Sequence, residues 1–113
     1  MHEMSLAEGV LGIIETARQR QRFDRVHAVR LEIGALAGVE IEALRHCLEI
    51  VLQRSVARDA SIDFDIKPGS GFCLDCGQTV PIMTLYADCP RCSGAHVQAT
   101  GGLDMRVLDL TVN

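Results

Sequence analysis

Hydrophobic side chains recur along this chain with two periods, and each change of period marks a change of predicted element. Over residues 6–17 apolar side chains return every three or four positions, as on one face of a helix. Over 26–33 they alternate with polar ones, which is typical of a strand with one buried face. A helical pattern over 41–52, an alternating one over 62–66 and a β-forming run over 103–112 follow. This order predicts an α/β fold with three strands and two helices.

The first predicted helix has a start signal and a weakness. Ser5 and Glu8 have the spacing of a capping box, in which the hydroxyl accepts the Glu8 N–H and the carboxylate reaches back to the cap. We therefore expect the helix to begin at about Ser5 and to end near Phe23. Gly9 and Gly12 each weaken it by roughly 1 kcal/mol relative to alanine. Tertiary packing, through a close approach of backbones, is expected to compensate.

Three arginines gather toward the end of this helix. They are Arg18, Arg20 and Arg22. Positive charge at that position complements the negative end of the helix dipole. The simplest interpretation is a solvated face, and the alternative is a docking surface for a partner.

Four cysteines form the most specific chemical pattern in the chain. Two C-x-x-C pairs, Cys73 with Cys76 and Cys89 with Cys92, are separated by twelve residues. Two intervening residues let one turn aim both sulfurs at a single ion, and the second turn completes a tetrahedron with Zn–S distances of about 2.3 Å. Two disulfides or a thioredoxin-like redox pair are the alternatives. A Zn(II) site with four thiolates and no open position is predicted to be structural.

Three further residues bear on this cysteine chemistry. Gly77 and Gly94 follow the two pairs, at places where a positive φ would turn backbone N–H groups toward sulfur. Cys47, the fifth cysteine, lies in the apolar stripe of the second predicted helix. Free cysteine is among the most buried residue types, so we expect Cys47 to be a core residue and not a ligand.

Glycine- and proline-rich segments at 68–71 and 101–102 separate the cysteine region from the rest. We expect them to act as hinges. The predicted fold is a small mixed three-stranded sheet with two helices, plus an inserted zinc-ribbon-like domain with four cysteine ligands. Residues 1–68 and 102–113 would form the discontinuous α/β domain that carries the amino terminus, and residues 69–101 the zinc-binding insertion.

Composition and charge narrow the function further. The 113 residues carry a net charge of −4, which argues against a nucleic-acid partner. The opening residues show no basic region followed by an apolar stretch and a cleavage site, so we expect no signal peptide, and no apolar run approaches the ~18 residues of a membrane span. With cysteines suited to a reducing compartment, we expect a cytoplasmic protein without a membrane partner. The sequence contains no nucleophile motif, no phosphate loop and no zinc site with an open position, so we do not expect an enzyme.

The first three residues form a candidate nickel site if the chain begins with a free amine. The Met1 amine, together with the amide nitrogen and imidazole of His2, makes adjacent chelate rings in one plane, and the amide or carboxylate of Glu3 can supply a fourth donor. Such a nitrogen-rich square suits Ni(II) or Cu(II) far better than zinc. A frayed chain end without function is the alternative.

Taken together these motifs resemble the HypA/HybF family, the nickel-delivery accessory proteins of [NiFe]-hydrogenase maturation. The resemblance rests on the opening residues 1–6, on segments 31–34 and 37–40, and on two C-x-x-C pairs in that order. It covers nearly the whole chain. It implies that the M-H-E start holds nickel and that the four cysteines hold structural zinc.

The resemblance also implies partners. Ni(II) would pass to the hydrogenase large subunit in concert with a HypB-type GTPase; some relatives also serve urease, and nothing in the sequence chooses between the clients. A nickel metallochaperone is therefore the leading hypothesis. The alternative is a zinc-ribbon protein–protein adaptor without nickel transfer. The adaptor would hold zinc alone, whereas the chaperone would hold one zinc and about one nickel per chain.

Overall fold

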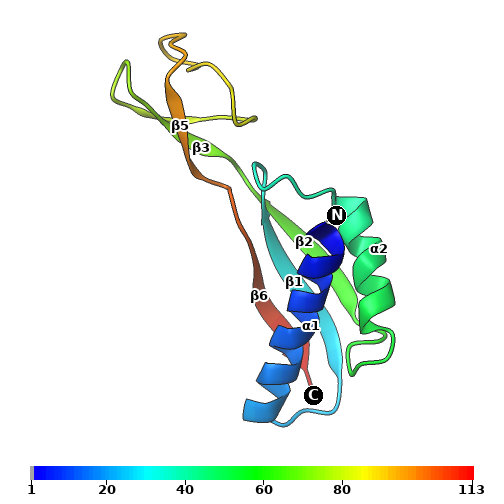
Figure 1. The fold of residues 1–113 in the computed structure, drawn as a ribbon. Helices are drawn as coiled ribbons and strands as arrows, with labels where there is room; N and C mark the ends of the chain where they lie inside the picture. Colours follow the sequence, from blue (N-terminus) through cyan, green and yellow to red (C-terminus); the bar gives the residue numbers. More distant parts are fainter. Residues whose placement is uncertain (1) are drawn as a thin grey trace. The chain divides into compact units, whose positions relative to one another are not determined.

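The computed structural model describes residues 2–113, which form two helices and six strands (Figure 1). The helices are α1 (His2–Arg20) and α2 (Ile41–Leu52). The strands are β1 (Val26–Gly34), β2 (Ser61–Lys67), β3 (Ser70–Cys73), β4 (Thr79–Pro81), β5 (Val97–Gly101) and β6 (Met105–Val112). They make two three-stranded sheets, ordered β2-β1-β6 and β4-β3-β5. The predicted fold class is confirmed, and the second sheet adds to it.

The described chain packs as two compact units. The first comprises the chain up to Leu31, Val39–Asp63 and Val107–Asn113. The second comprises Glu32–Gly38 and Phe64–Arg106, so it includes the end of β1 as well as the cysteine region. The narrower insertion expected at 69–101 stays a prediction.

Hydrogen bonds give the direction of β1 and β2. Ser61 Oγ donates to the His27 carbonyl, and the Ala35 N–H donates to the Lys67 carbonyl at 2.8 Å. The partner numbers rise together, so the two strands are parallel. Parallel neighbours need a crossover connection, and α2 lies within the segment that joins them.

Strand β6 lies on the other side of β1 and runs antiparallel to it. The Asn113 N–H donates to the Arg25 carbonyl at 3.2 Å, and further along Arg30 pairs with Asp109 at 2.6 Å. Both side chains of that ion pair are about half exposed, so it stabilises the sheet by only about 0–1 kcal/mol. It marks the solvent-facing side of β1.

The core of the first unit is aliphatic. Cys47 belongs to it with 4% exposure, as expected for a packing residue. Within the part of the chain that the structure describes, neither helix combines the length and apolar character needed to cross a membrane. Other buried side chains of this core include Ala7, Val10, Ile14, Val26, Val29, Leu31, Leu44, Leu48 and Leu52.

The start of α1 differs from the prediction. The helix already includes His2, so Ser5 lies inside it and the expected capping box is wrong. It also ends before Phe23, which is buried in the following loop. A tertiary contact accounts for the early start: the Glu3 carboxylate accepts the backbone N–H of Glu40 at 3.3 Å and so fixes the first turn.

The second unit has a much smaller core. Strand β3 pairs antiparallel with both β4 and β5. The buried residues beside this sheet are Leu36, Cys73, Val80, Ile82 and Cys89. Leu36 comes from the turn after β1, and its N–H donates to the Gly102 carbonyl at 2.8 Å. Two of the five core residues are therefore cysteines.

The glycines of α1 face open space, which contradicts the close backbone approach expected for them. Apart from its chain neighbours and the helix's own backbone, a Cβ at Gly9 or Gly12 would meet no described atom within 4 Å. We predict that Gly9→Ala and Gly12→Ala each raise the free energy of unfolding by up to about 1 kcal/mol, measured by urea titration with far-UV circular dichroism. Gly38 also faces open space but has φ +70°, a conformation that alanine adopts only with strain. Gly38→Ala should therefore lower the free energy of unfolding by about 1 kcal/mol. Destabilisation by either helix substitution would contradict this account.

Candidate metal sites

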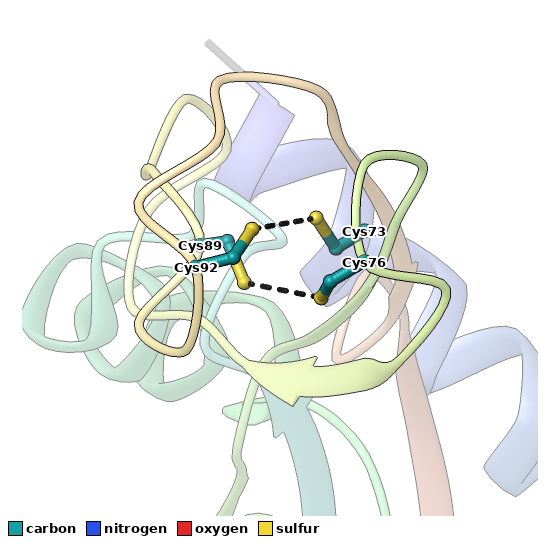
Figure 2. A group of neighbouring side chains, drawn as sticks. All are labelled: Cys73, Cys76, Cys89 and Cys92. Carbon is teal, nitrogen blue, oxygen red and sulfur yellow. Dashed lines mark hydrogen bonds between the residues drawn. The ribbon is translucent and has the colours of Figure 1, made fainter.

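The four cysteine sulfurs meet in one cluster. All lie within 4.8 Å of one another, and Figure 2 shows Cys73 and Cys76 facing Cys89 and Cys92 with their sulfurs turned inward. The Sγ atoms are 3.6 Å apart for Cys73 and Cys92, and 3.9 Å apart for Cys76 and Cys89. In a tetrahedron with metal–sulfur bonds of about 2.3 Å, adjacent sulfurs lie about 3.8 Å apart. The geometry therefore fits a four-thiolate metal site, and every cysteine is a free thiol.

The first turn of the cluster follows β3. Cys73 is the last residue of that strand and is fully buried. The Gly77 N–H donates back to the Cys73 carbonyl at 2.8 Å, and Gly77 has φ +70°. A left-handed residue is needed to close this turn, so the expectation for Gly77 is confirmed.

The second turn uses a different residue from the one predicted. The Ser93 N–H donates to the Cys89 carbonyl at 2.9 Å, and Ser93, not Gly94, has the positive φ of 62°. Backbone N–H groups of Arg91 and Gly94 donate to the sulfurs of Cys89 and Cys92, each at 3.4 Å. Such bonds stabilise thiolates, as we expect of these two turns.

Gly94 has another role, which involves a contact that the sequence did not reveal. A Cβ at Gly94 would collide with the carboxylate of Asp75, which lies between the first two cysteines. That carboxylate is 3.1 Å from His96 Nδ1, and the Leu74 N–H donates to the His96 carbonyl at 2.9 Å. These contacts join the first turn to the segment after the second.

The thiols differ in acidity. Burial opposes ionisation of Cys89, but N–H groups of Cys92 and Arg91 donate to its sulfur and bring its pKa to about 7. The Gly94 N–H favours the Cys92 thiolate, but the Cys73 sulfur and burial outweigh it and raise the pKa of Cys92 to about 12. An ion bound by four thiolates must therefore displace protons, and its affinity falls as pH falls.

The predicted nickel residues stand apart from this cluster in sequence, at the start of α1. Met1 lies outside the described residues. The His2 side chain is 54% exposed, and in the first helical turn its backbone N–H has no acceptor within the helix. The imidazole of His2 is therefore accessible to an incoming ion, and the helix does not use the His2 amide N–H.

Glu3 is held in a different way. The residue is 7% exposed, and its carboxylate accepts the Glu40 N–H while lying 3.5 Å from His2 Nε2. The Glu40 N–H is the main reason that the pKa of Glu3 falls below its ordinary value, in spite of burial. The carboxylate is thus ionised and engaged, and Glu40 in turn caps α2 by accepting the Ala43 N–H at 2.9 Å.

Comparison with known proteins now places the chain. The family model described as "Hydrogenase/urease nickel incorporation, metallochaperone, hypA" matches residues 1–112. "Hydrogenase maturation factor HypA" of Azoarcus sp. (strain BH72) is 53% identical over 112 residues, covering 99% of this chain and 98% of that protein. The protein of the same name from Dechloromonas aromatica (strain RCB) is 46% identical, covering 99% of each.

The fold agrees with these similarities. The solution structure of the Ni metallochaperone HypA from Helicobacter pylori matches with a TM-score of 0.72, covering 99% of this chain and 97% of that one. At 24% identity this match shows the fold alone. Since the family model and the relatives span nearly the whole sequence, the chain belongs to the HypA family of hydrogenase/urease nickel-incorporation metallochaperones.

Proposed function

We propose that this protein binds Ni(II) at its free amino terminus and delivers it to the large subunit of a [NiFe]-hydrogenase, in concert with a HypB-type GTPase. The observation that carries the proposal is the state of His2, whose side chain is 54% exposed and whose backbone N–H lies in the first turn of α1, where no helical carbonyl accepts it. Membership of the family supports the same conclusion. An exposed terminal site suits transfer, because a partner can reach the ion without unfolding the carrier.

The donors we assign to nickel are nitrogens. They are the Met1 amine, the amide and imidazole of His2, and the amide of Glu3. We leave out the Glu3 carboxylate because the Glu40 N–H donates to its Oε2 and holds the group beside the start of α2. Four nitrogens in a plane suit Ni(II), whose d-electrons favour that geometry.

We assign Zn(II) to the four thiolates, as a structural ion. The sulfur separations of 3.6 and 3.9 Å support this choice, and a soft four-sulfur site with no open position is typical of structural zinc. We further place the protein in the reducing cytoplasm, where thiols held for a metal persist without oxidation to disulfides.

The cysteine assignment predicts a selective loss of metal. Cys76→Ser and Cys92→Ser should each lose zinc, as measured by a colorimetric zinc assay. Loss of zinc should also loosen the second unit, because the two other ligands, Cys73 and Cys89, belong to its small core. The helical circular dichroism signal should persist, because α1 and α2 pack in the other unit. The matched control is Cys47→Ser, which should keep stoichiometric zinc. Stoichiometric, tightly held zinc in Cys92→Ser would remove the four-thiolate site.

The nickel assignment depends on the terminal amine. Adding Gly-Ser before Met1 converts the amine to an amide, and we predict that nickel affinity falls at least about a hundredfold, because joined chelate rings become a lone imidazole. His2→Ala should have the same effect. The His2 side chain is 54% exposed, so His2→Ala should alter the free energy of unfolding by less than about 0.5 kcal/mol, and we expect the same of the extension. Calorimetric titration with an absorption spectrum measures the binding.

Two histidine variants complete that experiment. His27→Ala and His46→Ala change exposed residues elsewhere and should leave nickel binding unchanged. If the extended protein binds nickel as tightly as the native one, with the same spectrum, the terminal site is wrong. Zinc without any nickel in the native protein would favour the adaptor.

The role of Glu3 can be tested separately. Gln at this position can still accept the Glu40 N–H, so Glu3→Gln should keep nickel affinity within about threefold, whereas Glu3→Ala should lose roughly tenfold as the first turn loosens. The pKa of the Glu3 carboxyl lies below its ordinary value of 4.5, so the carboxylate is ionised at every pH above 4.5. Nickel affinity should therefore fall with pH in parallel for Glu3→Gln and native protein. A much larger loss in Glu3→Gln than in His46→Ala would make the carboxylate a ligand.

A further inference from the structure

Positive charge is concentrated at one end of the first unit. Residues 15–25 and 53–59, which we call the basic end, comprise the last part of α1, the following loop and the turns after α2. They hold three of the chain's fifteen acidic residues but six of its eleven lysines and arginines. The six cations are Arg18, Arg20, Arg22, Arg25, Arg54 and Arg58. The protein as a whole carries a net charge of −4, so this end opposes the overall charge.

The two segments of the basic end meet in space. The Val26 N–H, directly after the first segment, donates to the Val56 carbonyl at 3.0 Å and so joins the start of β1 to the turns after α2. A groove of about 500 Å³ is lined by Arg18 and Arg25 from the first segment and by Arg54 from the second, with apolar side chains between them. An adjoining groove is lined by Arg18 and Arg22.

Most of this charge is not used within the unit. Among residues 2–113 the exposed guanidinium groups of Arg22, Arg25 and Arg54 have no hydrogen-bond or ion-pair partner. Arg18 donates to the Phe23 carbonyl at 3.0 Å, and Arg58 lies 3.7 Å from Asp59.

The negative ends of the helix dipoles do not account for the excess of positive charge at the basic end. Both α1 and α2 end in this region, and each helix end carries about half a negative charge. Two such ends amount to about one charge, which is less than the three unpaired arginines supply.

We propose that the basic end is a docking surface for an acidic segment of a partner protein. Guanidinium groups bind carboxylates through paired hydrogen bonds, and arginine beside apolar side chains is typical of the centre of protein interfaces. Glu15 and Asp24 line the same grooves. They would repel the continuous phosphates of a nucleic acid, as would the acidic remainder of the surface, whereas a protein segment can place its carboxylates only beside the arginines.

The location suits a carrier. Helix α1 has 19 residues and is therefore about 28 Å long, with His2 at one end and the basic end at the other. A partner bound at the basic end leaves the imidazole of His2 free. The inference does not depend on nickel binding, because it uses only charges and grooves at the far end of the helix.

The test compares two double variants with the same loss of charge. All variants are made in the zinc-loaded full-length protein. R22Q/R54Q removes one unpaired arginine from each segment of the basic end. The control K67Q/R91Q removes two exposed cations that lie outside the basic end. The probe is a fluorescein-labelled peptide of about twelve residues built from Asp, Glu and Leu, with a Lys and Leu peptide as its control. Anisotropy at low salt gives the dissociation constants.

We expect the native protein to bind the acidic peptide and not the basic one. R22Q/R54Q should weaken that binding about tenfold, while K67Q/R91Q should change it less than about twofold. Equal weakening by the two double variants would overturn the proposal, since net charge alone would then explain it. Failure of the native protein to bind the peptide would overturn it as well. So would a short DNA duplex that binds as tightly and responds to R22Q/R54Q in the same way.

Discussion

Four thiol groups lie within 4.8 Å of one another only if the backbone brings two separate turns together and a favourable interaction offsets their crowding. Two of these cysteines make up a core of five residues together with Leu36, Val80 and Ile82. Burying each aliphatic side chain contributes about 1.5–3 kcal/mol, whereas ordering the backbone costs about 1–2 kcal/mol per residue. On the proposed assignment, zinc supplies the difference, and the second unit folds around its metal.

The first unit contains none of the four clustered cysteines and has a different task. Its aliphatic core fixes α1, and the bond from Glu3 to Glu40 fixes the first turn of that helix. A terminal peptide that would otherwise be frayed thereby presents His2 on a rigid element. The arginines at the far end of α1 give the same helix a second exposed surface. On the two proposals above, partner binding and nickel binding take place at opposite ends of one helix.

Much of this architecture could be predicted because it rests on local signals. Hydrophobic period placed the two helices and three strands, and C-x-x-C spacing brought four cysteines to one point. The failures have a common cause, which is contact between residues far apart in sequence. Nothing near Ser5 announces that Glu3 will bond to Glu40 and start the helix earlier, and nothing near Leu36 announces that it packs beside Cys73.

The second turn of the cluster shows the same limit in detail. Glycine is the usual residue at a positive φ, so the sequence favoured Gly94 over its neighbour. In the structure Ser93 adopts that conformation, and Gly94 is small because Asp75 approaches it on the way to His96. The short strands β3, β4 and β5 were missed because three to five residues carry too little periodicity to be recognised.

X-ray absorption at the nickel and zinc edges of a single sample, loaded with both metals at neutral pH, tests the account most directly. We expect zinc to have four sulfur neighbours at about 2.3 Å and nickel to have a planar shell of nitrogen donors that includes one imidazole and no sulfur. Sulfur in the nickel shell, or nitrogen and oxygen in place of sulfur around zinc, would contradict it, because the proposed assignment gives all four thiolates to zinc and none to nickel.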